Sequence, residues 1–119
     1  MLTLHVSQAK ITEGPGVKAY WLAGYEGIRS NSLSFGLVEL LPETKIEFHK
    51  HTEEEELIFI IEGHGKVQLE DGDPEVIKPG TTAVFPKNTN HFIENESKNV
   101  MKWCYCFIPP TSIEDHISK

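Results

Sequence analysis

The chain has 119 residues, of which 39% are hydrophobic and 24% are charged, and its net charge is −7. This length allows one domain with one modest core and is too short for two. The excess of acidic residues, without any cluster of lysine or arginine, argues against nucleic acid, whose phosphates require a basic surface. No apolar run reaches the roughly 18 residues of a membrane span, and the start MLTLHVSQAK lacks the features of a signal peptide. We therefore expect a cytoplasmic protein.

The predicted elements are short apolar runs separated by turn signals, with almost no helical period. After the turn GPG, the predicted strands are VKAYWLA and then residues 33–41, 56–63, 66–70, 75–78, 81–86, 91–95 and 100–109. The run DGDP at 71–74 supplies a hairpin turn, and only the tail from Thr111 is compatible with a turn of helix. Strands that recur about every 8 to 12 residues predict a single antiparallel sandwich or barrel over residues 1–119.

The last predicted strand has two different faces, and either could line the interior. Met101, Trp103, Tyr105 and Phe107 form one face, and Lys102, Cys104 and Cys106 form the other. The two cysteines are the only ones in the chain, which is too few for a disulfide scaffold, and strand neighbours on one face rarely bridge. We expect both thiols to be reduced.

The stretch HKHTEEEE, residues 49–56, is the first candidate for chemistry. In a strand, residues i and i+2 share a face and lie about 7 Å apart. His49 and His51 can therefore converge on one metal ion. Two exposed histidines on a strand are the alternative, and the pair alone does not decide between them. The glutamates, in turn, could form a solvated loop or include a metal ligand.

A third histidine lies in GTTAVFPKNTNHFIEN, residues 80–95. Together with HKHTEEEELIFIIEG this segment resembles the cupin family, whose motifs read G-x5-H-x-H-x3-4-E-x6-G and G-x5-P-x-G-x2-H-x3-N. The resemblance covers residues 43–63 and 80–95, and the second motif is matched by Gly80, Pro86, His91 and Asn95. Glu43 and Asn88 stand where the motifs have glycine. Asn88 can keep a turn with positive φ, whereas Glu43 leaves its turn geometry open.

The resemblance implies an all-β fold, a small jelly-roll β-barrel of antiparallel strands with little helix. It also implies one divalent metal ion held by His49, His51, Glu56 and His91. Counting six residues back from the motif's closing Gly63 selects Glu56 and not Glu55. A carboxylate at the head of an apolar strand must be paired or metal-bound, because burying it alone costs several kcal/mol. The preceding glutamates, Glu53, Glu54 and Glu55, are expected in a loop facing water.

Three imidazoles and one carboxylate suit Mn, Fe, Co, Ni, Cu or Zn, and the sequence does not select among these metals. With Glu56 ionised the site would carry a charge of roughly +1, which favours a small anionic oxygen ligand. The first function class is a metal-dependent enzyme acting on a small organic acid, sugar or enol, of the isomerase, decarboxylase or dioxygenase type. The second is a non-catalytic module that binds a small molecule or a metal.

A general acid or base near the metal would favour the enzyme. Glu47 is the candidate, because it lies two residues before His49 and so on the same face. An exposed glutamate at the start of a strand is the alternative. Tyr20, Tyr25 and Arg29 could orient a substrate, although each also suits a core or surface position. Three histidines are expected away from the site: His64 in a turn, and His5 and His116 near the ends of the chain.

The strand after Glu56 also predicts assembly. Ile58 and Ile60 share one face, which we expect inside, and the opposite face carries Leu57, Phe59 and Ile61. A contiguous apolar patch of this kind marks an interface, so we expect a two-fold homodimer. A flap from the first 30 residues could cover the patch instead.

Overall fold

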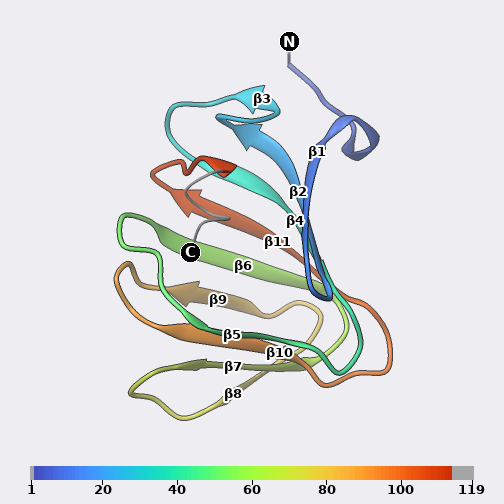
Figure 1. The fold of residues 1–119 in the computed structure, drawn as a ribbon, viewed down its shortest axis with the longest axis vertical. Helices are drawn as coiled ribbons and strands as arrows, with labels where there is room; N and C mark the ends of the chain where they lie inside the picture. The colour runs from blue at the N-terminus through green and yellow to red at the C-terminus, as the bar shows by residue number, and fades with distance from the viewer. Residues whose placement is uncertain (1, 114–119) are drawn as a thin grey trace.

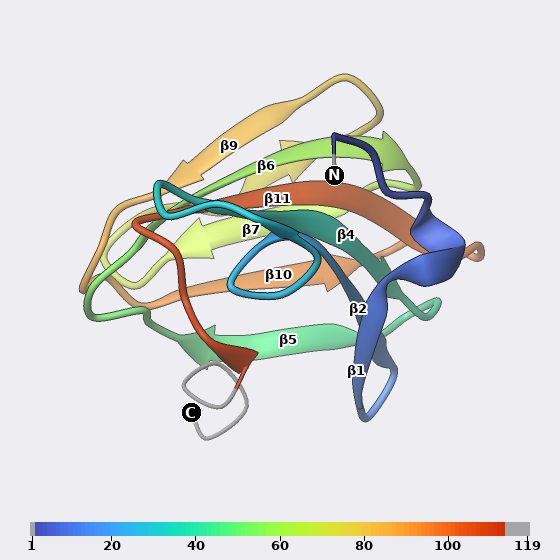
Figure 2. The same ribbon diagram turned by 90° about the horizontal axis from the view of Figure 1, so that it is seen from above.

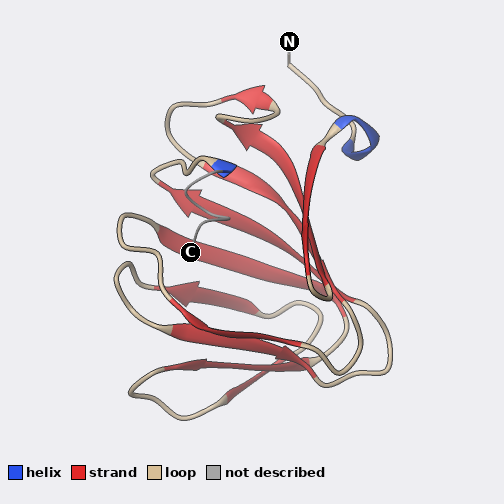
Figure 3. Ribbon diagram, in the orientation of Figure 1, coloured by secondary structure: helices blue, strands red, loops and turns tan. Residues whose placement is uncertain are grey.

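The computed structural model describes residues 2–113. Strands make up nearly all of its regular structure (Figure 3), and one short 3-10 turn, η1 (Val6–Gln8), precedes them. The larger sheet has seven strands in the order β1-β2-β4-β11-β6-β9, with β3 beside β2 (Figure 1). Its strands are β1 (Lys10–Gly14), β2 (Val17–Gly24), β3 (Ile28–Arg29), β4 (Ser34–Leu40), β6 (Glu55–Glu62), β9 (Thr82–Phe85) and β11 (Met101–Ile108).

The smaller sheet has four strands in the order β5-β10-β7-β8. They are β5 (Lys45–His49), β7 (Gly65–Leu69), β8 (Glu75–Ile77) and β10 (His91–Asn95). Figure 2 shows the two sheets as two layers with the interior between them. All strand pairs are antiparallel except the short parallel pair β2–β3. The predicted all-β jelly-roll fold is confirmed, as a sandwich whose sheets are not closed into a barrel.

Three strands are absent from the predicted set: β1, β3 and β5, of which β5 was considered only as the strand that would place His49 and His51 on one face. β1 has the short sequence KITEG, and it forms a hairpin with β2 in which Gly14 pairs with Val17. Edge strands of this kind are hard to recognise, because one side of the ladder is open and few side chains are buried. β3 has only two residues. The predicted turn of helix in the tail falls mostly outside the described residues, and in the described part no helix is long and apolar enough to cross a membrane.

The alternation along β6 and β11 decides what faces the interior. Met101, Trp103, Tyr105 and Phe107 are buried, which settles the face of the last strand, and Ile58 and Ile60 are buried as predicted. On the outer face, Phe59 is 45% exposed and Ile61 is 44% exposed. The described part of the first 30 residues therefore does not form the alternative flap over them; β1 and β2 instead extend the same sheet.

Two turns contain residues that stand where the motifs have glycine. Among the described residues, Glu43 (φ 55°) and Asn88 (φ 58°) are the only non-glycine residues with positive φ. Each thus adopts the left-handed conformation that glycine would take most easily. The backbone N–H of Asn88 donates to the carbonyl oxygen of His51 at 2.7 Å. The predicted turn at Asn88 is present, and it anchors the loop that carries His51.

The asparagine that closes the second motif has a structural role. The fully buried Asn95 donates through Nδ2 to the carbonyl oxygens of Leu40, Leu41 and Asn99, at 3.0, 3.1 and 2.8 Å. Its Oδ1 accepts from the backbone N–H and the hydroxyl of Ser97 at 2.9 and 2.6 Å. A buried amide with all its groups paired stabilises the packing it bridges. Asn95 thereby fixes the end of β10 against the chain leaving β4.

Candidate metal centre

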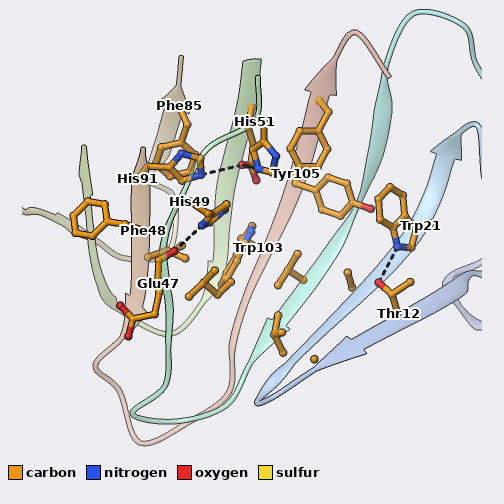
Figure 4. A pocket seen from close by; sticks show the side chains of 18 of the residues that line it. Thr12, Trp21, Glu47, Phe48, His49, His51, Phe85, His91, Trp103 and Tyr105 are labelled. Atoms are coloured by element: carbon orange, nitrogen blue, oxygen red, sulfur yellow. Dashed lines mark hydrogen bonds and ion pairs between the residues drawn. The ribbon is translucent and has the colours of Figure 1, made fainter. Parts of the chain in front are cut away.

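Three histidines meet at one end of the space between the sheets (Figure 4). His49 ends β5, His51 follows it in the loop, and His91 begins β10 directly opposite His49 in the antiparallel ladder. Their potential ligand nitrogens all lie within 4.8 Å of one another. Strand pairing thus brings together residues that are some forty positions apart in the chain.

Backbone carbonyls fix the orientation of two of these rings. Nδ1 of His49 lies 2.7 Å from the carbonyl oxygen of Glu47, and Nδ1 of His91 lies 3.2 Å from that of Thr89. Because a carbonyl oxygen only accepts, Nδ1 carries a proton in both rings, which leaves Nε2 as the nitrogen available to a ligand. The ring of Phe85 stacks on His91 with centroids 4.1 Å apart. Metal-binding histidines are commonly held through their second nitrogen in this way.

Glu56 enters the cluster from β6 in the opposite sheet. Its Oε1 lies 3.4 Å from Nε2 of His51 and 3.4 Å from Nε2 of His91. Burial alone would raise the pKa of this carboxyl, but hydrogen bonding and the charge of His51 and His91 lower the pKa to about 2. The buried Glu56 is therefore ionised at neutral pH, next to the imidazoles.

The other glutamates of the run differ from one another. Glu53 is exposed in the loop as predicted, and Glu55 is exposed although it begins β6. The prediction that Glu54 faces water is wrong, because its exposed fraction is 5%. Glu54 lies just before β6, so its burial does not follow from the alternation of the strand. Only Glu56 of the four lies among the residues around the interior cavity.

The residues present fit a divalent transition metal. Two donors bound to one ion at about 2.1 Å lie roughly 3.0 to 3.4 Å apart for octahedral to tetrahedral angles. The two 3.4 Å separations between Glu56 and the imidazole nitrogens match this requirement. Burial lowers the pKa of His49, despite its hydrogen bond to the Glu47 carbonyl, and so favours the neutral ring that can bind a metal. The chemistry of three imidazoles and one carboxylate suits Mn, Fe, Co, Ni, Cu or Zn.

A cavity of about 520 Å³ extends from the histidines toward the β1–β2 hairpin (Figure 4). Aromatic side chains from β2 and β11 form much of its wall: Trp21, Trp103, Tyr105 and Phe107. The indole N–H of Trp21 donates to Oγ1 of Thr12 at 3.0 Å, which ties the hairpin to the wall. The hydroxyl of Tyr105 donates to the carbonyl oxygen of Tyr20 at 3.1 Å. This volume lies within the range of about 300 to 1,000 Å³ that is typical of small-molecule sites.

The remaining predicted residues lie elsewhere. The side chain of Glu47 is 75% exposed and its carboxylate is 3.7 Å from Nζ of Lys45; Figure 4 shows it turned away from the histidines. Glu47 contacts the cluster only through its carbonyl oxygen. Tyr20 donates to Glu39 at 2.7 Å, outside the cavity. Two further candidates, Tyr25 and Arg29, contact each other and do not line the cavity either. His64 is exposed and lies away from the cavity, as expected.

The sequence reasoning did not assign the aromatic wall. Trp103 and Tyr105 were placed on one face of the last strand, but period-two alternation does not show which face is buried. Trp21 lies in the predicted strand β2, but its partner Thr12 lies in β1, which was not predicted. The signal that was available is the run of large aromatic residues in β11, because a face of that kind is more often buried than exposed.

The fold and the site define a jelly-roll β-sandwich with a cluster of three histidines in its interior. The family model of the cupin domain matches residues 36–108. The chain therefore belongs to the cupin family, as its two motifs predicted.

The chain is similar in sequence to two kinds of protein and in fold to solved cupin structures. An uncharacterized protein from Methanocaldococcus jannaschii is 37% identical over 91 residues, which are 76% of this chain and 70% of that protein. An L-ectoine synthase from Vibrio campbellii is 32% identical over 75 residues, or 62% of this chain and 56% of the synthase. The match thus spans little more than half of that enzyme. The crystal structure of an ectoine synthase from P. lautus superimposes with a TM-score of 0.84 at 18% identity, covering 100% of this chain and 86% of that one.

Proposed function

We propose that this cupin is a metal-dependent enzyme acting on a small oxygenated metabolite, with one divalent transition metal held by His49, His51, Glu56 and His91. The observation that carries the proposal is the position of this donor set at the end of an interior cavity. Structural metal sites are usually closed by protein ligands, whereas sites that bind substrate open onto a cavity. The similarity to an ectoine synthase supports an enzyme class without defining the reaction.

A metal bound here would supply Lewis-acid activation of a bound oxygen or, if it is iron, a centre for oxygen chemistry. The residues of the chain would bind the ligand and orient it at the metal. Glu56 offsets one of the ion's charges, so a small anionic oxygen ligand remains favoured. The aromatic wall makes the surroundings of the histidine end less polar, which strengthens electrostatic interactions there.

A non-catalytic binding module is the second candidate, and one observation favours it. Apart from Glu56, the carboxylates among the described residues lining the cavity are Glu13 and Glu47, and both are exposed. Each also has a lysine partner, Lys18 at 3.6 Å and Lys45 at 3.7 Å. The wall therefore offers no buried general acid or base beyond the metal-site groups.

The experiment begins with metal analysis of protein purified without chelators or a metal-binding tag. We expect close to one transition-metal ion per chain. Apo protein and protein reloaded with Mn, Fe, Ni or Zn are then screened against organic acids, sugars and enols. Turnover that depends on metal supports the enzyme, and tight binding without turnover supports the module. In the enzyme case, Glu47→Gln tests the predicted proton-transfer role of that residue: turnover falls at unchanged metal content if Glu47 carries it.

We also propose that the chain forms a two-fold homodimer through the outer face of the larger sheet. Leu57 pairs across the ladders with Val84 on one side and Cys106 on the other, and Cys106 pairs in turn with Phe35. This row continues the patch of Phe59, and Val84 is 49% exposed and Phe35 39% exposed. An apolar sheet face of this breadth is more typical of an interface than of a free surface.

A cytoplasmic location stays a prediction from the sequence.

A further inference from the structure

The cavity wall differs in chemistry from the surface of this acidic protein. Among the described residues that line it there is no lysine and no arginine. The aliphatic part of the wall comes from both sheets, with Val17, Ala19 and Val38 on one side and Ile46 and Ile93 on the other. A second anionic group on a ligand would therefore meet no lysine or arginine in the wall itself, and burying it there unpaired is costly.

The polar atoms of the wall are largely engaged by the protein itself. The N–H of Trp21 and the hydroxyl of Tyr105 already donate to Thr12 and Tyr20. Trp103 keeps an N–H that, in Figure 4, lies at the end of the cavity near His49. That donor suits an oxygen of a group held at the histidines. Several hydroxyls of a sugar would find few partners farther along the wall, and a buried polar group without a partner is destabilising.

The mouth of the cavity, where its lining residues are exposed to solvent, carries acidic side chains. Glu13 and Glu47 line the cavity with side chains that are 67% and 75% exposed. Their lysine partners lie 3.6 and 3.7 Å away and are themselves partly exposed, so this pairing is weak in water. A second carboxylate that reaches the exposed part of the cavity would meet acidic side chains there.

From the wall and the mouth together we propose that the site selects a ligand with one anionic oxygen head and an uncharged, apolar body. The head lies at the histidines and Glu56, and the body lies against Val38, Ile46, Trp103 and Tyr105. Dicarboxylates and polyhydroxylated sugars are disfavoured. This inference rests on the proposed metal site and narrows its substrate class.

The test uses three α-keto acids as probes of the zinc-loaded protein, since each carries the same α-keto carboxylate head. Pyruvate has almost no body, α-ketocaproate adds three methylene groups, and α-ketoadipate has the length of α-ketocaproate with a second carboxylate. Each buried methylene is worth about fourfold in affinity, which predicts α-ketocaproate binding about 50-fold more tightly than pyruvate. We expect α-ketoadipate to bind at least about tenfold more weakly than α-ketocaproate. Calorimetry and quenching of tryptophan fluorescence measure binding without requiring turnover.

A charge introduced into the wall gives an independent arm. Val17→Lys places a cation at the mouth and is expected to reduce the preference for α-ketocaproate over α-ketoadipate about tenfold or more. Val76→Lys is the matched control, because Val76 is 77% exposed and does not line the cavity; it should leave the preference unchanged. Thermal melts of both variants establish that they fold.

The outcomes separate the inference from the proposed function. Protein that takes up no zinc contradicts the metal site itself. Protein that holds one zinc ion per chain but binds α-ketoadipate as tightly as α-ketocaproate, or binds pyruvate as tightly as either, overturns the selection for an apolar body. A Val17→Lys variant that keeps both its fold and the original preference overturns it as well.

Discussion

Replacing Glu56 by glutamine is the sharpest test of the candidate metal centre. The substitution keeps the side chain's size and one oxygen but removes the charge that lies 3.4 Å from two imidazole nitrogens. Loss of a group that only supports a ligand typically lowers metal affinity by about 10- to 100-fold. A direct ligand that also carries the site's only negative charge contributes more. We therefore expect Glu56→Gln to weaken metal binding by more than about 100-fold, or about 2.7 kcal/mol.

The neighbouring glutamates provide matched controls for this measurement. Glu55 is exposed at the start of β6, so its charge is screened by water and Glu55→Gln is expected to change metal affinity by no more than about threefold. Glu54 is buried but does not line the cavity, so Glu54→Gln is expected to alter the free energy of unfolding more than the metal affinity.

Competition with a chromophoric chelator measures the three affinities under identical conditions, and thermal melts of the apo proteins show whether each variant folds. Similar losses for Glu56→Gln and Glu55→Gln would refute the assignment of Glu56. A loss of metal affinity in Glu54→Gln alone would instead identify Glu54 as the carboxylate ligand.

Three further predictions concern the rest of the molecule. His51→Ala and His91→Ala are each expected to remove most of the bound metal while the apo protein still folds; elemental analysis decides, and full metal content in either variant contradicts the site. Phe59→Glu places a charge on the outer apolar face, and we expect monomer or aggregate where the unmodified protein is a dimer; light scattering that gives 13.5 kDa for the unmodified protein would exclude the dimer. Burial and the neighbouring Cys104 raise the pKa of the Cys106 thiol above its ordinary value, so at pH 7 we expect slower alkylation than for free cysteine; equal rates at pH 7 would contradict this.

The sequence predicted most of the fold because the buried strands carry strong local signals. β6 and β11 have β-branched and aromatic residues in alternation, and both lie in the middle of the larger sheet. β1 was missed for the opposite reason: it is an edge strand whose residues are mostly exposed, so its sequence resembles a loop. Because β1 was missed, the part of the cavity wall that it contributes was missed too, including the hydrogen bond from Trp21 to Thr12.

The three histidines could be predicted because they match the spacing of the two motifs. The periodicity of a single strand does not show which residues of another strand lie opposite it. His49 and His91 face each other across the β5–β10 ladder, a non-local contact that no local pattern contains. The error at Glu54 has a different origin. The segment before Glu56 was treated as a solvated loop, but a loop residue packed against the protein can be buried, as Glu54 is at 5% exposure.

The departures from the motif glycines show what the family pattern requires physically. Glu43 and Asn88 differ chemically from glycine and from each other, yet both have the positive φ that the turn needs. The conformation is therefore retained where the residue type is not, at a cost of about 1 to 2 kcal/mol for a side chain in that region. At Asn88 this conformation allows a specific hydrogen bond, because the backbone N–H of Asn88 donates to the carbonyl oxygen of His51 at 2.7 Å. The turn at Asn88 therefore supports the loop of the candidate metal centre through a backbone hydrogen bond, which does not depend on the chemistry of the Asn88 side chain.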